Sequence, residues 1–138
     1  GETSRASFPA LDADEQTRHK GEMLLPNLVL SLARDHVAAF LLQPRGPGLT
    51  DITCRFLFAA EAMAQADFDP SDAVDFWDVV NRQDWAVCEA VQRGMGARVF
   101  DYGALSPLED WSLDVRRYVT DRTGLDERGL DSAPTGQE

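Results

Sequence analysis

The sequence predicts an α+β fold, in which an antiparallel β-meander packs against two long helices. Three apolar runs of strand character follow one another, separated by short turn-forming segments: residues 22–32, 36–44 and 50–59. Sequential strands joined by short turns pair antiparallel. Two later segments, residues 69–94 and 106–124, place apolar residues at helical spacing. A sheet of this kind needs a cover, and these two helices supply it.

The strand runs carry their own positional signals. Pro26 lies inside the first run and predicts an edge strand or a bulge there, because proline donates no ladder hydrogen bond. In the third run the apolar residues alternate with mostly polar ones, which predicts one buried and one mostly wet face. The residues on the buried side are Ile52, Cys54, Phe56 and Phe58.

Both predicted helices begin and end with typical capping residues. Asp69 is the expected N-cap of the first helix, with Pro70 at its first position. The second helix opens with Ser106 and Glu109 at capping-box spacing, and Gly124 is its expected stop.

The chain divides into three parts of different character. Residues 1–21 form a polar, irregular leader with at most a short helical turn, and residues 124–138 form a polar tail that we expect to be disordered. Residues 22–123 are the folded part. At 138 residues the chain has the size of one domain. It begins at Gly1 without an initiator methionine, so we expect it to be a piece of a longer polypeptide.

The charge balance argues against two classes of partner. With 13 basic and 24 acidic residues, the formal net charge of −11 repels nucleic-acid backbones and anionic membrane surfaces. The chain has no apolar run long enough for a transmembrane helix and no signal-peptide pattern. Cys54 and Cys88 belong to no CxxC or Cys/His motif. These features predict a reduced, cytoplasmic protein.

Asp84 lies where a charge is unexpected. At about 100° per residue, the first helix places Asp84 on the same side as Trp77, Val80, Cys88 and Val91, the side predicted to pack on the sheet. A buried carboxylate needs a partner, because removing it from water costs many kcal/mol. Three explanations remain open: hydrogen bonds from backbone, a tyrosine or Arg55; contact with another subunit or domain; and a bound metal ion.

The histidines of the sequence do not complete a metal site. His19 lies in the leader and His36 in a turn between two strands, and neither has a second histidine at the i, i+4 spacing of a helical metal motif. We expect both to be exposed loop residues. If Asp84 binds metal, its histidine partners lie outside this chain.

The segments "QDW...CE.VQRG", "PNL" and the "ED" that opens the last helix occur in an order and spacing that resembles the catalytic domain of Rieske-type non-haem iron oxygenase α subunits. The resemblance covers residues 8–119 and is strongest to the branch of choline, glycine betaine and stachydrine oxygenases. It implies a helix-grip fold and a mononuclear iron held by two histidines and one carboxylate. Asp84 matches the carboxylate position.

The resemblance also implies partners and a reaction. The two histidines and the Rieske domain with its [2Fe-2S] cluster would precede Gly1, and a ferredoxin or reductase would supply electrons. The complete protein would use O₂ to hydroxylate an aromatic ring or to demethylate a quaternary amine, whereas this piece alone would be inactive. Trp77, Asn81 and Cys88 are expected to line the substrate cavity, with Gln92 behind the metal ligand.

Two other functions remain open. One is a helix-grip module that binds a small ligand without redox chemistry, and the other is an acidic interaction or assembly domain. For the isolated piece we expect a homo-oligomer, because truncation exposes surface that the missing part would cover.

Overall fold

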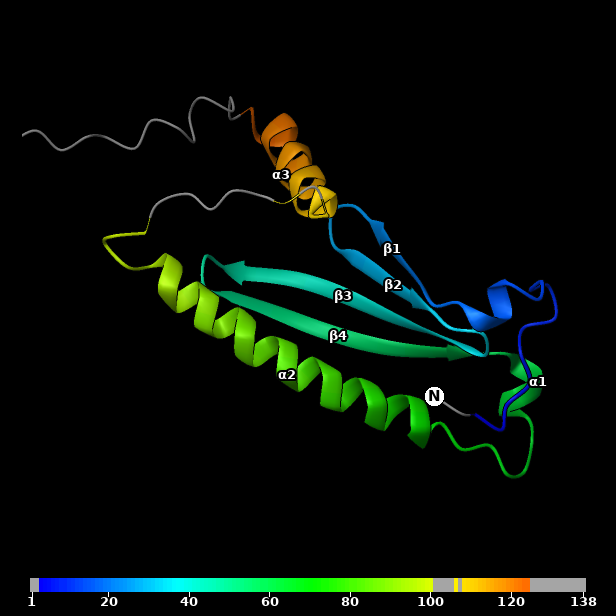
Figure 1. Ribbon diagram of the computed structural model, residues 1–138. Coiled ribbons are helices and arrows are strands. Elements are labelled where there is room, and N and C mark those ends of the chain that lie inside the picture. The colour runs from blue at the N-terminus through cyan, green and yellow to red at the C-terminus, as the bar shows by residue number, and fades with distance from the viewer. Residues whose placement is uncertain (1–2, 101–105, 107, 125–138) are drawn as a thin grey trace, which may run out of the picture.

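A computed structural model of the chain describes residues 3–100, 106 and 108–124. A 3-10 turn, η1 (Glu15–Thr17), precedes four strands and three helices. The strands are β1 (Lys20–Leu24), β2 (Leu28–Leu32), β3 (His36–Gly46) and β4 (Leu49–Phe58); the helices are α1 (Ala60–Met63), α2 (Ser71–Met95) and α3 (Asp110–Thr123). Figure 1 shows α2 extending alongside the long β3–β4 hairpin, with α3 near the β1 side of the sheet.

The sheet is a four-stranded antiparallel meander in the order β1-β2-β3-β4, which confirms the α+β prediction. The prediction of a single strand over residues 22–32 is wrong. This run folds into two strands, since the chain turns at Leu25–Asn27 around Pro26. The proline signal was therefore correct about the interruption, but the interruption is a complete reversal of the chain and not a bulge.

One face of the sheet, here called the front face, packs toward α2. Phe40 of β3 contacts Trp77 of α2 edge to face, with 5.1 Å between ring centroids. Cys54 lies opposite Phe40 in the register, and Phe56 and Phe58 follow on the same side of β4. These β4 residues are half-buried, whereas the alternate residues Thr53, Arg55 and Leu57 are exposed, as the alternation predicted. Ile52, also predicted on the buried side, is exposed, because it lies toward the turn end of the β3–β4 hairpin, beside an open groove.

The predicted capping residues make hydrogen bonds ahead of both helices, but they are not the N-caps: α2 begins after Pro70 and α3 after Glu109. Asp69 Oδ1 accepts a hydrogen bond of 2.9 Å from the backbone N–H of Ser71, the first residue of α2. Ahead of α3, the N–H of Ser106 donates to Glu109 and Ser106 Oγ accepts from the N–H of Leu108, which is the reciprocal pattern of a capping box. Gly124 follows α3 in the left-handed conformation, with φ of 67°.

The third helix rests on the outer strand of the sheet. A Cβ atom added at Gly21 of β1 would lie 3.0 Å from the ring of Trp111, which shows how closely α3 approaches this strand. Trp111 itself remains half exposed. The predicted tail, apart from Gly124, lies outside the described residues.

Very little of the described chain is deeply buried. Ala38 and Ala73 are the only apolar residues in the buried class among the described residues, and no large side chain there is fully enclosed. Several large apolar residues of α2 are more than half exposed, among them Phe76, Val87 and Val91. No helix among the described residues has the length and apolarity needed to cross a membrane.

Candidate functional site

Asp84 lies in the middle of α2, but it is exposed. The prediction that the sheet buries it is therefore wrong. Within the described part of the chain it has no hydrogen bond or ion pair, so Arg55 and backbone donors do not act as its partners there. The other two explanations, a contact with another segment and a metal ion, both place the missing partner outside the residues described.

The error comes from the rotation of the helix about its axis. The side of α2 that faces the sheet is marked by Trp77, half-buried Asn81, Trp85, Cys88 and Gln92. In a helical projection the centre of this side is turned by roughly 50° from the predicted one. Asp84 consequently lies at its margin.

Beside the sheet-facing side, α2 carries a second apolar stripe that is exposed from Val87 onward, although Ala73 and Val80 in the same sector are buried and half-buried. We call it the outer stripe; its members are Phe76, Val80, Val87, Val91 and Met95, and all but Val80 are about half exposed or more. Asp84 is the one charged residue that a helical projection places within it. The carboxylate thus lies on the boundary between the sheet-facing side and an uncovered apolar surface.

The C-terminal half of α2 stands off the sheet and leaves an open groove of about 1040 Å³. Trp85, Cys88 and Gln92 line it from the helix, and the ends of β3 and β4, including Ile52 and Thr53, line it from the sheet. Its volume is at the upper end of the range for small-molecule sites.

A second hollow, of about 620 Å³, lies at the other end of α2. Trp77 and Phe76 form its apolar wall, and His19, His36 and Asp72 contribute polar atoms. The four residues predicted around the substrate and metal are therefore distributed: Trp77 lines this hollow, Cys88 and Gln92 line the groove, and half-buried Asn81 lines neither.

The prediction of exposed loop histidines is wrong for His36, which is the first residue of β3. Its side chain is only 14% exposed, and its Nδ1 lies 2.9 Å from Asp35 Oδ1. His19 is exposed as predicted, but its ring contacts Ser31 Oγ and lies 6.2 Å from the Trp77 ring.

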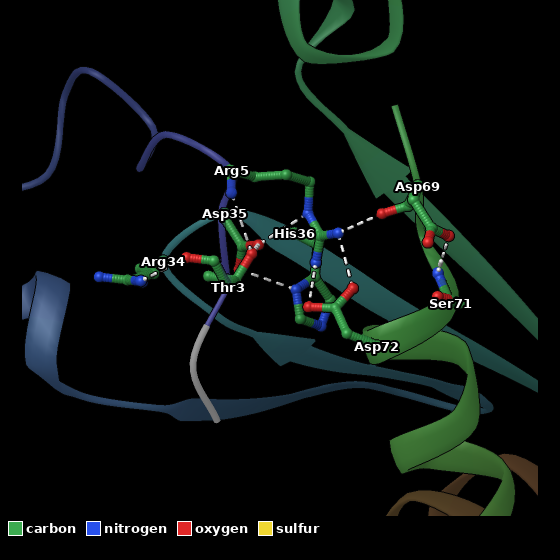
Figure 2. Close-up of polar contacts among 8 residues, drawn as sticks. All are labelled: Thr3, Arg5, Arg34, Asp35, His36, Asp69, Ser71 and Asp72. Atoms are coloured by element: carbon green, nitrogen blue, oxygen red, sulfur yellow. Dashed lines mark hydrogen bonds and ion pairs between the residues drawn. The ribbon is translucent and has the colours of Figure 1, made fainter. Parts of the chain in front are cut away.

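A polar cluster around Arg5 was missed from the sequence. Arg5 of the leader joins the β2–β3 turn to the start of α2: its Nε donates to Asp35 Oδ2 at 2.9 Å, and Nη2 donates to Asp72 at 2.8 Å (Figure 2). A further bond of 2.6 Å reaches the carbonyl of Asp69. The guanidinium also lies 5.0 Å from the centre of the Phe58 ring.

The electrostatics of this cluster favour its ionised form. Burial acts to raise the pKa of the Asp35 carboxyl, but hydrogen bonds from His36 and Thr3 and the charge of Arg5 outweigh it, so that pKa lies below its ordinary value. The hydrogen bond from Arg5 likewise lowers the pKa of Asp72. No spacing in the sequence links Arg5 with Asp35, so the cluster could not be found there. Its role is structural: it fixes the leader against the sheet and α2.

A metal ion needs more ligands than the described residues of this chain provide together with Asp84. Among the described residues, no group of three or more histidine, cysteine, aspartate or glutamate side chains is arranged to hold a metal ion. Asp84 by itself can supply one carboxylate oxygen donor. Chemically, the chain can contribute a ligand and cavity walls, but its described residues do not complete an iron site.

The comparisons with known proteins agree with the architecture. A protein family described as the catalytic domain of the ring-hydroxylating α subunit matches residues 1–123. The oxygenase subunit of glycine betaine monooxygenase from Chromohalobacter salexigens is 29% identical over 100 residues, which cover 66% of this chain. Those residues span only 22% of that relative. No solved structure gives a significant match.

Proposed function

Because the chain belongs to the family of ring-hydroxylating α-subunit catalytic domains, we propose that it is the C-terminal part of the catalytic domain of a Rieske-type oxygenase. Its share of the chemistry would be the carboxylate ligand of the mononuclear iron, Asp84. The observation that carries this proposal is the position of Asp84: a lone carboxylate at the edge of an uncovered apolar stripe, accessible to ligands brought by another segment.

The proposal assigns the remaining parts of the site to the rest of a longer polypeptide. Two histidines and a Rieske cluster would come from there, and a ferredoxin or reductase would deliver electrons. When bound, the iron would supply the activation of O₂. This chain would hold one ligand and wall the cavity, chiefly through the groove residues Trp85, Cys88 and Gln92, while Trp77 would wall the second hollow.

For the substrate we propose an N-methylated quaternary amine, with an aromatic ring as the broader alternative. The relative belongs to a glycine betaine monooxygenase, and glycine betaine is such an amine, which favours this class of substrate. Half-exposed aromatic rings such as Trp85 and Trp77 are suitable for a quaternary ammonium group, since the face of an indole attracts cations.

The test is the iron content of two proteins: the 138-residue chain and the complete polypeptide that its gene encodes. We expect weak Fe(II) binding by the chain alone, because one carboxylate does not replace the missing nitrogen ligands. In the complete polypeptide, Asp84→Ala should remove most of the mononuclear iron.

Asp78→Ala is the matched control. Asp78 lies on the same helix, is exposed, and pairs with Arg82 at 2.8 Å, so its loss should leave the iron content unchanged. Tight stoichiometric iron binding by the isolated chain, or full iron retention in Asp84→Ala, would refute the assignment.

A second candidate is a ligand-binding module without redox chemistry, and the open groove of about 1040 Å³ is the observation that favours it. Glycine betaine or a simple aromatic acid would then raise the melting temperature of the isolated chain, because a ligand that binds the native state stabilises it. A thermal shift in the absence of iron that Trp85→Ala abolishes would support this candidate over the first.

A further inference from the structure

The face of the sheet opposite α2, here called the back face, is more apolar than the sequence suggested. The register brings six apolar residues of the two central strands side by side: Leu28, Leu30 and Leu32 of β2 with Leu41, Ala39 and Val37 of β3. They continue onto the outer strands at Leu24 and Leu57, which are 49% and 53% exposed. The prediction of a mostly wet second face therefore holds for β4 but not for the centre of the sheet.

The rim of this surface is polar. Lys20 and Glu22 border it on β1, and Thr53 and Arg55 border it on β4. The front-face residues Phe40 and Phe58 make the sheet's aromatic contacts with α2 and with Phe68, and Trp111 of α3 approaches Gly21, also on the front face. An apolar centre with a polar rim is typical of a surface that is covered in the assembled protein.

We propose that the back face is the docking surface for an amphipathic helix from the remainder of the same longer polypeptide. The apolar part that crosses β2 and β3 without a polar residue is two strands wide, about 10 Å, which is the width of one helix. Strands that are apolar on both faces are typical of a sheet covered on both sides.

A second copy of the chain fits the surface less well. At about 10 Å across two strands and about 17 Å along five residues, the apolar centre extends over roughly 170 Å², well below the ~800 Å² per partner of a stable interface. The net charge of −11 also opposes self-association. A covalently linked helix needs no such area, because its effective concentration is high. The matched relative is long enough to provide one, since this chain corresponds to 22% of it.

The experiment compares Leu30→Asp in the isolated 138-residue chain and in the complete polypeptide. In the isolated chain Leu30, like the other five central residues of the back face, is half-buried, so the new carboxylate keeps contact with water and the melting temperature should fall by about 2 °C at most. In the complete polypeptide the same carboxylate is buried under the helix, and the melting temperature should fall by about 5 °C or more. Leu41→Asp should behave in the same way.

Leu108→Asp is the matched control, because Leu108 is 96% exposed and belongs to no strand of the sheet; it should have little effect in either protein. Equal destabilisation by Leu30→Asp in both proteins would overturn the proposal, as would no effect in either. A concentration-dependent dimer of the isolated chain that Leu30→Asp dissociates would assign the surface to a second copy instead. A gene that encodes no further residues would also overturn it.

The inference rests on the part of the proposed function that makes this chain a piece of a longer polypeptide, but not on the iron site. Asp84→Ala tests iron content, whereas Leu30→Asp tests the melting temperature. If Asp84 proves not to bind iron, the melting-temperature result for Leu30→Asp still stands. If Leu30→Asp fails to distinguish the two proteins, the iron result for Asp84 still stands.

Discussion

Removal of the Arg5 side chain should destabilise the chain far more than removal of an arginine from a surface ion pair. The side chains of Arg5 and Asp35 are only 8% and 3% exposed, and Arg5 joins the leader to both the β2–β3 turn and α2. In Arg5→Ala, Asp35 keeps its contacts with His36 and Thr3 but loses the only full positive charge beside it at neutral pH among the described residues.

The expected cost follows from these contacts. Breaking a buried ion pair by removing one partner costs about 3–5 kcal/mol. The remaining hydrogen bonds to Asp35 reduce that figure, while the lost cation–π contact with Phe58 adds about 0.5–1 kcal/mol. The ion pair with Asp72 adds little, since the Asp72 side chain is 42% exposed. We expect a net loss of about 3 kcal/mol in the free energy of unfolding.

Urea unfolding followed by tryptophan fluorescence measures this loss. With a denaturant dependence of about 2 kcal/mol per molar urea, the midpoint should fall by about 1.5 M. Arg45→Ala is the matched control, because Arg45 pairs with Asp51 at 2.7 Å while both side chains are more than half exposed. Its midpoint should fall by no more than about 0.5 M. Arg5→Lys should lie between the two, since lysine keeps the charge but loses the planar fork.

Equal midpoint shifts for Arg5→Ala and Arg45→Ala would refute the reasoning. They would mean that the leader does not hold its position in solution, or that His36 and Thr3 alone satisfy Asp35. An Arg5→Lys midpoint as low as that of Arg5→Ala would instead indicate that the hydrogen-bond geometry carries the stabilisation rather than the charge.

Two further predictions concern pH and the aromatic contact. The pKa values of Asp35 and Asp72 are lowered in the folded chain, so the stability that these carboxylates contribute is complete above the unfolded pKa of about 3.9 and is lost as the pH falls through the folded values. Wild type should therefore lose more stability below pH 4 than Arg5→Ala. Acid unfolding curves that run parallel for the two proteins would contradict this. Trp77→Ala should lower the free energy of unfolding by about 2 kcal/mol, since half-buried Trp77 contacts Phe40 and Phe76. Val79→Ala, at a position 56% exposed, is the control and should lower it by under about 0.5 kcal/mol. Equal losses for the two variants in urea unfolding would show that α2 does not pack on the sheet through Trp77.

Local sequence signals predicted those features of the fold that depend on neighbouring residues. The alternation of Cys54, Phe56 and Phe58 in β4 and the stop at Gly124 are set by residues within a few positions of one another, and both were confirmed. Asp69 and Ser106 make the expected local hydrogen bonds, but the N-caps themselves are Pro70 and Glu109. Pro26 was expected to mark an edge strand or a bulge, but it lies in the turn between β1 and β2, since a strand proline by itself does not distinguish these cases.

Features that depend on distant residues were not predictable in the same way. Arg5 lies 30 positions from Asp35 and 67 from Asp72, and no local pattern indicates that they meet. His36 illustrates a related limit: a histidine at the first position of a strand resembles a turn residue until the buried carboxylate beside it is known. The tertiary fold brings these charges together. The periodicity of a single sequence carries no information about which distant residues meet.

The wrong prediction that Asp84 is buried has the same origin as the failure to predict an apolar back face. A helix or strand that is covered on two sides carries two apolar surfaces, and periodicity reports their sum without indicating which one faces which neighbour. In α2 the sum of the sheet-facing side and the outer stripe is centred near Asp84, so the residue was assigned to the middle of a single buried face. In β2 and β3 both faces are apolar for the same reason. Two apolar surfaces in one chain are what the proposed place of this chain in a longer polypeptide would produce. Each surface can therefore be tested on its own, by iron content at Asp84 and by melting temperature at Leu30.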